Sequence, residues 1–300
     1  MKHRNIPLSG LITNPKQEIS GLDWYGDDLV LLPENLGGYL FMISKDELYS
    51  SIQSKKPKPI EPRQTPFITP DYSKLIPGFE GFESIAFFDD QFVVTLEAKH
   101  EGDMHGYIAW GVIDPKTRVA KIADQEPLEI PMPVQINNMT FESVLVDGKN
   151  IILFYEANGI NIRDSAWQPV VSENRTVSKI DHPHLEYRIT DVSRLDAENR
   201  FWAINYLWPG DKKRLKPAKD TISERYGEGK SHQKSEAVER LIEFKLFDGS
   251  IKFSGHEPIE IELEEDGSRN WEGLVRLDKK GFLIATDKFP GSLLGFVPNN

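Results

Sequence analysis

One pattern recurs five times along the chain and constrains its fold more than any other feature. In each copy a polar residue opens an apolar run, a turn follows, and a second apolar run ends on another polar residue. The last copy, residues 270–297, reads NWEGLVRLDKKGFLIATDKFPGSLLGFV, and Gly, Pro and Asp bound its runs as they bound short strands. The other copies begin at residues 20, 83, 142 and 191.

The polar residues keep a nearly constant spacing. The opening residues are Ser20, Glu83, Glu142, Asp191 and Glu272, and the closing residues are Glu34, Glu97, Glu156, Asn205 and Asp287. The separation is the same in the first four copies and one residue longer in the last. Regular repeats made only of strands are typical of β-propellers. We therefore expect an all-β, five-bladed β-propeller, or a six-bladed one if residues 44–79 or 163–188 hide a further blade.

The two ends of the repeat array complete this prediction. The last copy supplies three strands, whereas a blade needs four. We expect residues 6–13, IPLSGLIT, to pair with the last blade, because such closure removes exposed sheet edges. The prediction is thus a single domain over residues 1–300, closed by an N-terminal strand.

The fourth copy is interrupted by a polar, locally basic insertion, residues 207–240. We expect helical stretches at 220–226 and 235–240 within it. Long insertions of this kind are usually functional or disordered. Because the insertion leaves from the end of a second strand, we expect it to lie over the channel mouth.

Composition restricts the classes of partner. The chain has no cysteine and a formal net charge of -11. Disulfides and thiolate metal sites are therefore excluded, and nucleic acid or an anionic membrane is disfavoured as the main partner. No apolar run approaches the ~20 residues of a membrane helix. The N-terminus makes a poor signal peptide, so the sequence leaves localisation open between the cytoplasm and a leader-trimmed periplasmic or secreted protein.

The polar residues are expected to meet at one end of a central channel. The first strand of a blade lines the channel, and the second runs back antiparallel, so opening and closing residues share one face. Two unit charges ~4 Å apart repel by about 4 kcal/mol at an effective dielectric near 20. Either some carboxylates are protonated, with raised pKa values, or a cation lies among them.

Oxygen ligands at flexible spacing suit Ca²⁺ best, and Mg²⁺ or Mn²⁺ next. We predict a central Ca²⁺ bound by Ser20, Glu83, Glu142, Asp191 and Glu272. The alternative is that the acids cap turns or pair with basic side chains of neighbouring blades, of which the candidates are Arg188, Arg269, Lys99 and Lys288.

The paired motif resembles the phytase-like and SdiA-regulated propeller proteins. The match is best in Trp271-Glu272-Gly273-Leu274 with Asp287-Lys288, and in Glu83-Ser84-Ile85 with Glu97-Ala98-Lys99. The five-fold count and a ring that mixes Ser with Glu and Asp are also similar to the calcium-activated nucleotidase (apyrase) propellers. The resemblance covers the inner strands of all repeats. This chain departs from the pattern at Val192, where a small residue is usual, and at Ser20, where an acid is usual.

The resemblance implies a Ca²⁺-dependent hydrolase of a phosphate ester or anhydride, with the metal as Lewis acid. Glu97 and Glu156 are the candidate catalytic residues, since a second-ring carboxylate can orient or deprotonate water. The candidate substrate-binding residues are Glu34, Lys99, His100, Asn205, Asp287 and Lys288.

Two other functions remain open. One is a lactonase or arylesterase, in which Asn205 would supply an amide ligand to the metal. The other is a non-enzymatic binding propeller, in which the cation is structural. The expected partner is a small anionic molecule or an unidentified protein at the channel mouth.

Overall fold

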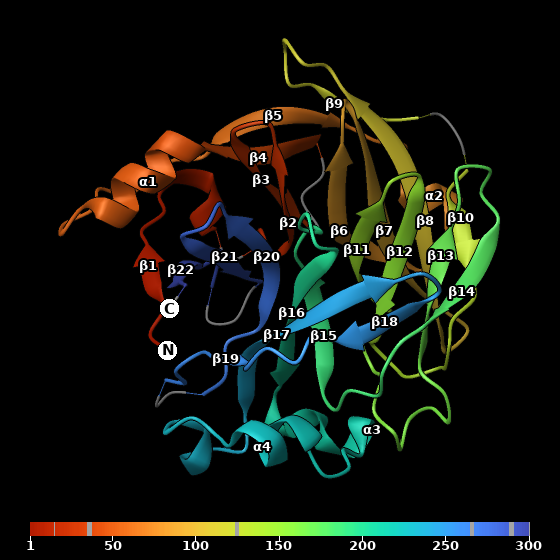
Figure 1. The fold of residues 1–300 in the computed structure, drawn as a ribbon. Helices are drawn as coiled ribbons and strands as arrows, with labels where there is room; N and C mark the ends of the chain where they lie inside the picture. The colour runs from red at the N-terminus through yellow and green to blue at the C-terminus, as the bar shows by residue number, and fades with distance from the viewer. Residues whose placement is uncertain (15, 35–37, 124–125, 265–266, 288–290, 300) are drawn as a thin grey trace.

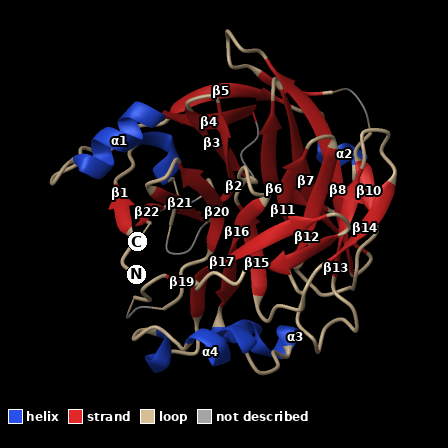
Figure 2. Ribbon diagram, in the orientation of Figure 1, coloured by secondary structure: helices blue, strands red, loops and turns tan. Residues whose placement is uncertain are grey.

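The fold is an all-β propeller, in which short helices lie only at the periphery (Figures 1 and 2). The computed structural model describes residues 1–300 except 15, 35–37, 124–125, 265–266, 288–290 and 300. No helix within the described residues is long and apolar enough to cross a membrane.

The described strands form three sheets, one of four strands and two of nine. Each larger sheet contains two antiparallel groups of four strands joined by a short parallel pairing, so five such groups can be distinguished in the described residues. The first group is β2 (Ile19–Tyr25), β3 (Asp28–Pro33), β4 (Gly38–Ser44) and β5 (Arg63–Ile68). The second is β6 (Phe79–Phe88), β7 (Gln91–His100), β8 (Asp103–Ile113) and β9 (Ala120–Ile122). The third is β11 (Phe141–Asp147), β12 (Asn150–Tyr155), β13 (Trp167–Val171) and β14 (Val177–Asp181). The fourth is β15 (Arg188–Val192), β16 (Arg200–Leu207), β17 (Val238–Phe247) and β18 (Ser250–Phe253), and the fifth is β20 (Trp271–Leu277), β21 (Gly281–Thr286), β22 (Leu294–Pro298) and β1 (Arg4–Ile6).

The remaining elements decorate these groups. The short strands β10 (Leu128–Ile130) and β19 (Ile259–Glu260) pair with β8 and β17. The helices are α1 (Lys45–Gln53), α2 (Tyr72–Leu75), α3 (Lys212–Leu215) and α4 (Thr221–Tyr226), with 3₁₀ turns η1 (Gly10–Thr13), η2 (Pro209–Asp211) and η3 (His232–Lys234).

The first strand of each group lies nearest the middle of the molecule (Figure 1). Contacts run from β2 to β6, β11, β15 and β20 in turn, and β20 packs back against β2. The predicted segments 44–79 and 163–188 supply outer strands, namely β5 in the first group and β13 and β14 in the third. The repeat therefore marks the inner strands, as the sequence predicted.

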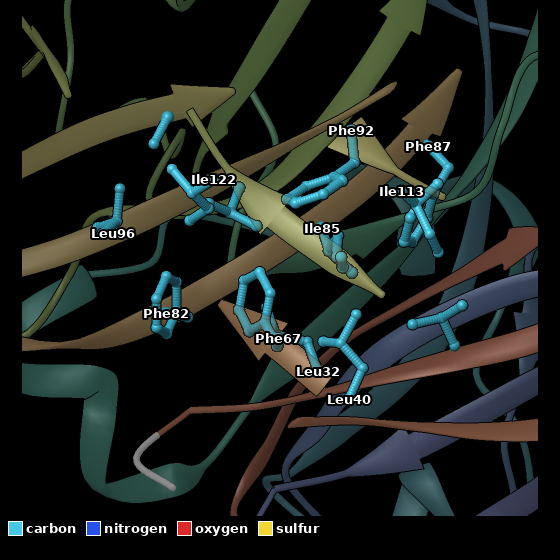
Figure 3. Packing of buried hydrophobic residues seen from close by; sticks show 14 of the residues in the cluster. Leu32, Leu40, Phe67, Phe82, Ile85, Phe87, Phe92, Leu96, Ile113 and Ile122 are labelled. Atoms are coloured by element: carbon cyan, nitrogen blue, oxygen red, sulfur yellow. The ribbon is translucent and has the colours of Figure 1, made fainter. Parts of the chain in front are cut away.

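Apolar side chains fill the space between adjacent groups. Leu32 and Leu40 of the first group pack with Phe82 and Phe92 of the second, joined by Phe67 (Figure 3). Equivalent clusters lie between the other neighbouring groups. Burial of this kind contributes about 25 cal/mol per Å² of apolar surface, so these layers supply most of the favourable free energy of folding.

The N-terminus does pair with the last group, but through different residues from those predicted. The pairs between β1 and β22 run from Arg4 with Phe296 to Ile6 with Leu294. Of the predicted stretch 6–13 only Ile6 belongs to the strand, and Gly10–Thr13 is a 3₁₀ turn. Pro7 has no N–H to extend the ladder, which explains why the strand ends there.

Two helix assignments also differ from the sequence. Residues 235–240 were expected to be helical, yet β17 begins at Val238, because pairing with β16 overrides helix propensity there. Helix α1 was not predicted, although its signal is present. Ser44 and Glu47 form a capping box, in which the Ser44 side chain accepts from the Glu47 N–H and the Glu47 carboxylate accepts from the Ser44 N–H.

His182 is buried between the third and fourth groups without hydrogen bonds to either ring nitrogen among the described residues. Its ring lies 6.0 Å from that of Phe154 and 5.3 Å from that of Phe244. Burial lowers the pKa of His182 to about 3. Since the pKa of this histidine in the unfolded state is near 6.5, the folded state takes up the proton at a lower pH than the unfolded state does. Stability is therefore lost as the pH falls from 6.5 toward 3.

We expect His182→Phe to remove this acid sensitivity. At pH 5 the effect on the free energy of unfolding is about 2 kcal/mol, from roughly 1.4 kcal/mol per pKa unit. Urea unfolding at pH 7.5 and pH 5 measures it. Titratable groups that wild type and variant share contribute equally to both free energies of unfolding, so they cancel in the difference between the two proteins. The substitution His100→Phe, at an exposed histidine, serves as control. Identical pH dependence in wild type and variant would contradict the prediction.

Candidate functional site

A bulge recurs at the opening position of the inner strands. In four groups the residue at this position of the first strand has no partner on the second strand, and the register of the pairing shifts there. These residues are Ser20, Glu83, Glu142 and Glu272. Bulges re-aim side chains, and all four side chains are nearly fully buried where the inner strands meet. Four of the five predicted ring residues therefore occupy equivalent positions.

The fifth ring residue is misplaced by one position in the prediction. Ile189 pairs with Asn205 and Val192 with Ala203, so the bulge contains both Thr190 and Asp191. The Thr190 hydroxyl donates to the backbone carbonyl of the next inner strand at 2.5 Å, as the Ser20 hydroxyl does at 2.6 Å. Thr190 thus takes the position predicted for Asp191.

Asp191 lies one residue further along the channel and joins three inner strands. Its carboxylate accepts hydrogen bonds from the Ser143 hydroxyl at 2.9 Å, from its neighbour Val192 N–H at 2.8 Å and from Leu274 N–H at 2.6 Å. Burial raises the pKa of Asp191, although these hydrogen bonds oppose the shift. In this arrangement Asp191 holds strands together.

Asn205 is likewise turned away from the predicted ring. Its Nδ2 donates to the carbonyls of Glu186 and Arg188 at 2.9 and 3.1 Å, and its Oδ1 accepts from Arg240 Nε at 2.8 Å. Because Asn205 pairs with the residue before the bulge, the closing position in the fourth group belongs to Tyr206. A single irregular bulge shifted both members of this repeat.

Arg188, at the start of β15, lies among three carboxylates that come from the third and fifth groups. Its Nε donates to Glu156 Oε2, and its Nη2 lies 3.8 Å from Glu142 Oε1 and 3.7 Å from Glu272 Oε1. Burial alone would lower the pKa of Arg188, but the carboxylates of Glu156, Glu142 and Glu272 outweigh it and raise the pKa. A built-in guanidinium therefore offsets part of the repulsion.

The alternative of basic partners is thus confirmed for Arg188. It does not extend to Arg269, which instead pairs with Glu239 at 2.7 Å and with Glu264 at 3.0 Å.

Thr140 connects the two predicted catalytic residues. Its hydroxyl donates to Glu97 Oε2 at 2.7 Å, and its backbone N–H donates to Glu156 Oε1 at 3.1 Å. Glu156 is 0% exposed and both its oxygens are occupied, by Thr140 and Arg188. Glu97 keeps 7% exposure. Of these two residues, Glu97 keeps the larger exposed fraction.

Several carboxyl groups here are held toward their protonated forms. Burial, and then the charges of Glu156 and Glu80, raise the pKa of Glu97 to about 8 against the opposing Thr140 hydrogen bond. Burial and Glu97 raise the pKa of Glu83. Burial and the charge of Glu156 raise the pKa of Glu142, and burial and the charge of Asp287 raise the pKa of Glu272. We call Glu83, Glu97, Glu142, Glu156 and Glu272 the mouth carboxyl cluster.

Two of the predicted calcium ligands, Glu142 and Glu272, lie beside Arg188. Among the residues that the structure describes, no group of three or more His, Cys, Asp or Glu side chains is arranged to hold a metal ion. Arg188 instead lies between Glu142, Glu156 and Glu272, so the residues as placed fit a guanidinium rather than a metal ion. The Ca²⁺ stays a prediction.

The predicted substrate-binding residues divide into two sets. Glu34 and Asp287 lie near the cluster, since the charge of Glu34 contributes to the raised pKa of Glu83, and Asn270 Nδ2 donates to both Glu272 (2.5 Å) and Asp287 (2.9 Å). Lys99 and His100 are exposed at the C-terminal end of β7, just beyond Glu97, and His100 Nε2 lies 3.7 Å from Glu101. Lys288 falls outside the described residues.

The insertion packs on the same face of the third and fourth groups. Arg214 Nη1 donates to the carbonyl of Asn137, three residues before Thr140, at 3.0 Å. Asn161 Nδ2 donates to the carbonyl of Lys216 at 2.9 Å, and the Ala218 N–H donates to Glu186 Oε2 at 3.0 Å. These partners lie in the segments that flank the mouth carboxyl cluster in sequence.

Comparison with known proteins defines the class of fold. No family model matches the chain, and no curated protein matches it. Two solved structures align with a TM-score of 0.50 and 11% identity: an exo-1,5-alpha-L-arabinanase from a bovine ruminal metagenomic library, over 96% of this chain and 94% of that one, and a putative glycoside hydrolase from Bacteroides ovatus, over 95% and 87%. The chain is a β-propeller protein. These likenesses support the propeller expected from the resemblance but not the phytase-like, SdiA-regulated or apyrase families specifically.

Proposed function

We propose that this protein is a five-bladed propeller hydrolase whose mouth carboxyl cluster supplies a general acid and a general base. The observation that carries the proposal is Glu97, a residue with 7% exposure whose carboxyl pKa is raised to about 8. Such a group is protonated at neutral pH and can give its proton to a leaving oxygen. Carboxyl groups pushed to different protonation states by their surroundings are the usual components of acid–base catalysis.

We assign the base to Glu272. Asn270 donates to its Oε1 at 2.5 Å and Arg188 Nη2 lies 3.7 Å from the same oxygen, so both stabilise the ionised form. The raised pKa of Glu272 makes its carboxylate, once ionised, a stronger base. Glu156 is assigned a positioning role in place of the predicted catalytic one, because it holds Arg188 and, through Thr140, Glu97.

The substrate class that suits this site is an uncharged glycoside. An excess of carboxyl groups over one guanidinium disfavours an anionic substrate, whereas sugar hydroxyl groups donate readily to carboxylates. Hydrolysis of a glycosidic bond needs one carboxyl group to protonate the leaving oxygen and another to activate water. The insertion, residues 207–240, would cover one side of the bound sugar.

A second candidate is the Ca²⁺-dependent phosphohydrolase predicted from the sequence. The same surplus of negative charge supports it, since a bound cation would relieve the remaining repulsion and attract a phosphate. It requires the acidic side chains to move from the positions that Arg188 now imposes on them.

A substrate panel distinguishes the candidates. We expect the purified protein to hydrolyse nitrophenyl glycosides or arabinan at rates that EDTA does not change. Phosphate release from nitrophenyl phosphate or nucleotides that requires added Ca²⁺ would favour the second candidate instead. Turnover of phenyl acetate or a lactone alone would indicate the esterase alternative, and no turnover of any substrate would indicate a binding propeller.

A further inference from the structure

A second cleft lies where the turns between first and second strands meet, away from the mouth carboxyl cluster. Its outer part, about 350 Å³, is lined by the aromatic side chains of Trp24, Tyr25 and Phe87 and by four charged residues. Its inner part, about 300 Å³, shares Phe87, Asp89 and Arg194 with the outer part and reaches Asp191 in the channel. The sequence analysis assigned no role to these residues.

Most of the side chains that line the inner part of the cleft are apolar, and the charged ones are Asp23, Asp89, Asp191 and Arg194. Its lining includes Leu22, Ile85, Ala86, Val144, Leu145 and Val192. Ligand sites are commonly cavities of about 300–1,000 Å³ with apolar walls and a few placed polar groups. The inner part is therefore suited to an apolar side chain of a ligand. The polar groups of the outer part then determine which charged groups that ligand must have.

Arg194 is fixed between the two parts. Its Nε and Nη2 each donate to Asp23 at 2.7 Å, and Nη2 also donates to the Phe87 carbonyl at 3.0 Å. The remaining nitrogen, Nη1, makes no hydrogen bond to a described residue, and the side chain is 49% exposed. A guanidinium held in this way presents one free N–H edge, which suits a carboxylate.

Most charged side chains of the outer part already have partners. Arg118 lies over the Tyr25 ring, 4.7 Å from its centroid, and pairs with Asp28 at 3.2 Å. Asp90 accepts from the Tyr25 hydroxyl at 2.6 Å, while Asp89 has no hydrogen bond or ion pair within the described part of the chain. Among the described residues of the outer part, Arg194 Nη1 and Asp89 are left without hydrogen-bond partners, so a ligand that carries a single charge can satisfy only one of them.

We propose that this cleft binds a zwitterion with an apolar side chain, such as a free apolar amino acid. Its carboxylate would accept from Arg194 Nη1, its ammonium group would lie against Asp89, and its side chain would enter the inner cavity. This site is independent of the mouth carboxyl cluster and of the proposed hydrolysis.

Isothermal titration of wild-type protein with L-phenylalanine, N-acetyl-L-phenylalanine and L-phenylalaninamide tests the ligand class. We expect L-phenylalanine to bind about tenfold or more tightly than either singly charged analogue, a difference of about 1.4 kcal/mol. Equal binding of the acetylated analogue would overturn the role of Asp89, and equal binding of the amide would overturn that of Arg194. Absence of L-phenylalanine binding would overturn the site.

Two variants test the location. Asp89→Asn should weaken L-phenylalanine binding about tenfold, and because Asp89 has a φ of 50°, asparagine is the replacement that this backbone tolerates. Asp278→Asn, at a turn with a φ of 49° outside the cleft, is the matched control and should bind as wild type does. Ala86→Leu fills the inner cavity and should weaken L-phenylalanine more than glycine. Unchanged affinities in both cleft variants would contradict the proposal.

Discussion

Glu97→Gln is expected to reduce turnover by about 10²–10⁴-fold, the usual contribution of a general acid. The amide keeps the shape of the side chain and its contact with Thr140 but has no proton to give. Because the pKa of Glu97 is about 8, wild-type activity should decline above pH 8 as this group ionises. In the variant, turnover should be low and the decline in activity above pH 8 should be absent.

The control for this substitution is Glu173→Gln, an exposed carboxylate that pairs with Lys149 at 2.8 Å. It should leave both turnover and the pH profile unchanged. A Glu97→Gln protein that retains more than a tenth of wild-type turnover would exclude Glu97 as the acid. Removal of Glu97 should also change the pH dependence of the free energy of unfolding. The sign of this change should be opposite to that for a carboxylate whose pKa is lowered by an ion pair.

The sign follows from the direction of the shift in pKa. Burial raises the pKa of Glu97 above its unfolded value, so the folded state binds the proton more tightly than the unfolded state. Folding is therefore favoured below the unfolded pKa of about 4.5, and this contribution is lost as the pH rises toward 8. Glu97→Gln should make unfolding in urea less dependent on pH across that window.

Arg188→Met is expected to lower the free energy of unfolding by about 3–5 kcal/mol, the usual cost of breaking a buried ion pair. The substitution leaves Glu156, which has no exposed surface, without its charged partner, and removes the positive charge beside Glu142 and Glu272. Urea unfolding at pH 7.5 measures the loss. Since the unpaired carboxylates can then be protonated, the deficit should shrink at pH 5.

The double variant Arg188→Met, Glu156→Gln separates the lost pair from the lost volume. It should recover most of the stability, because the buried carboxylate that needed a partner is gone. Recovery by Glu156→Gln of less than about a quarter of the loss would show that Arg188 acts by packing on Tyr206, whose ring centroid lies 5.7 Å away.

The repeated pattern predicted the inner strands because alternating apolar residues and turn residues act locally. The three strands expected in the last copy of the repeat are β20, β21 and β22. Local signals also predicted α4, and the Ser44 capping box would have predicted α1. Where pairing with a distant strand competes with local propensity, as at residues 235–240, the sequence prediction was wrong.

By itself, then, the sequence determined that acidic side chains recur at one phase of a strand repeat, since strand period and turn position are properties of neighbouring residues. Tertiary structure alone decided what those side chains meet. Because of the two-residue bulge in β15, Thr190 and not Asp191 occupies the position equivalent to the other opening residues. Arg188 lies beside carboxylates that are distant from it in the sequence. Both outcomes depend on register and long-range packing, which one strand's sequence does not encode.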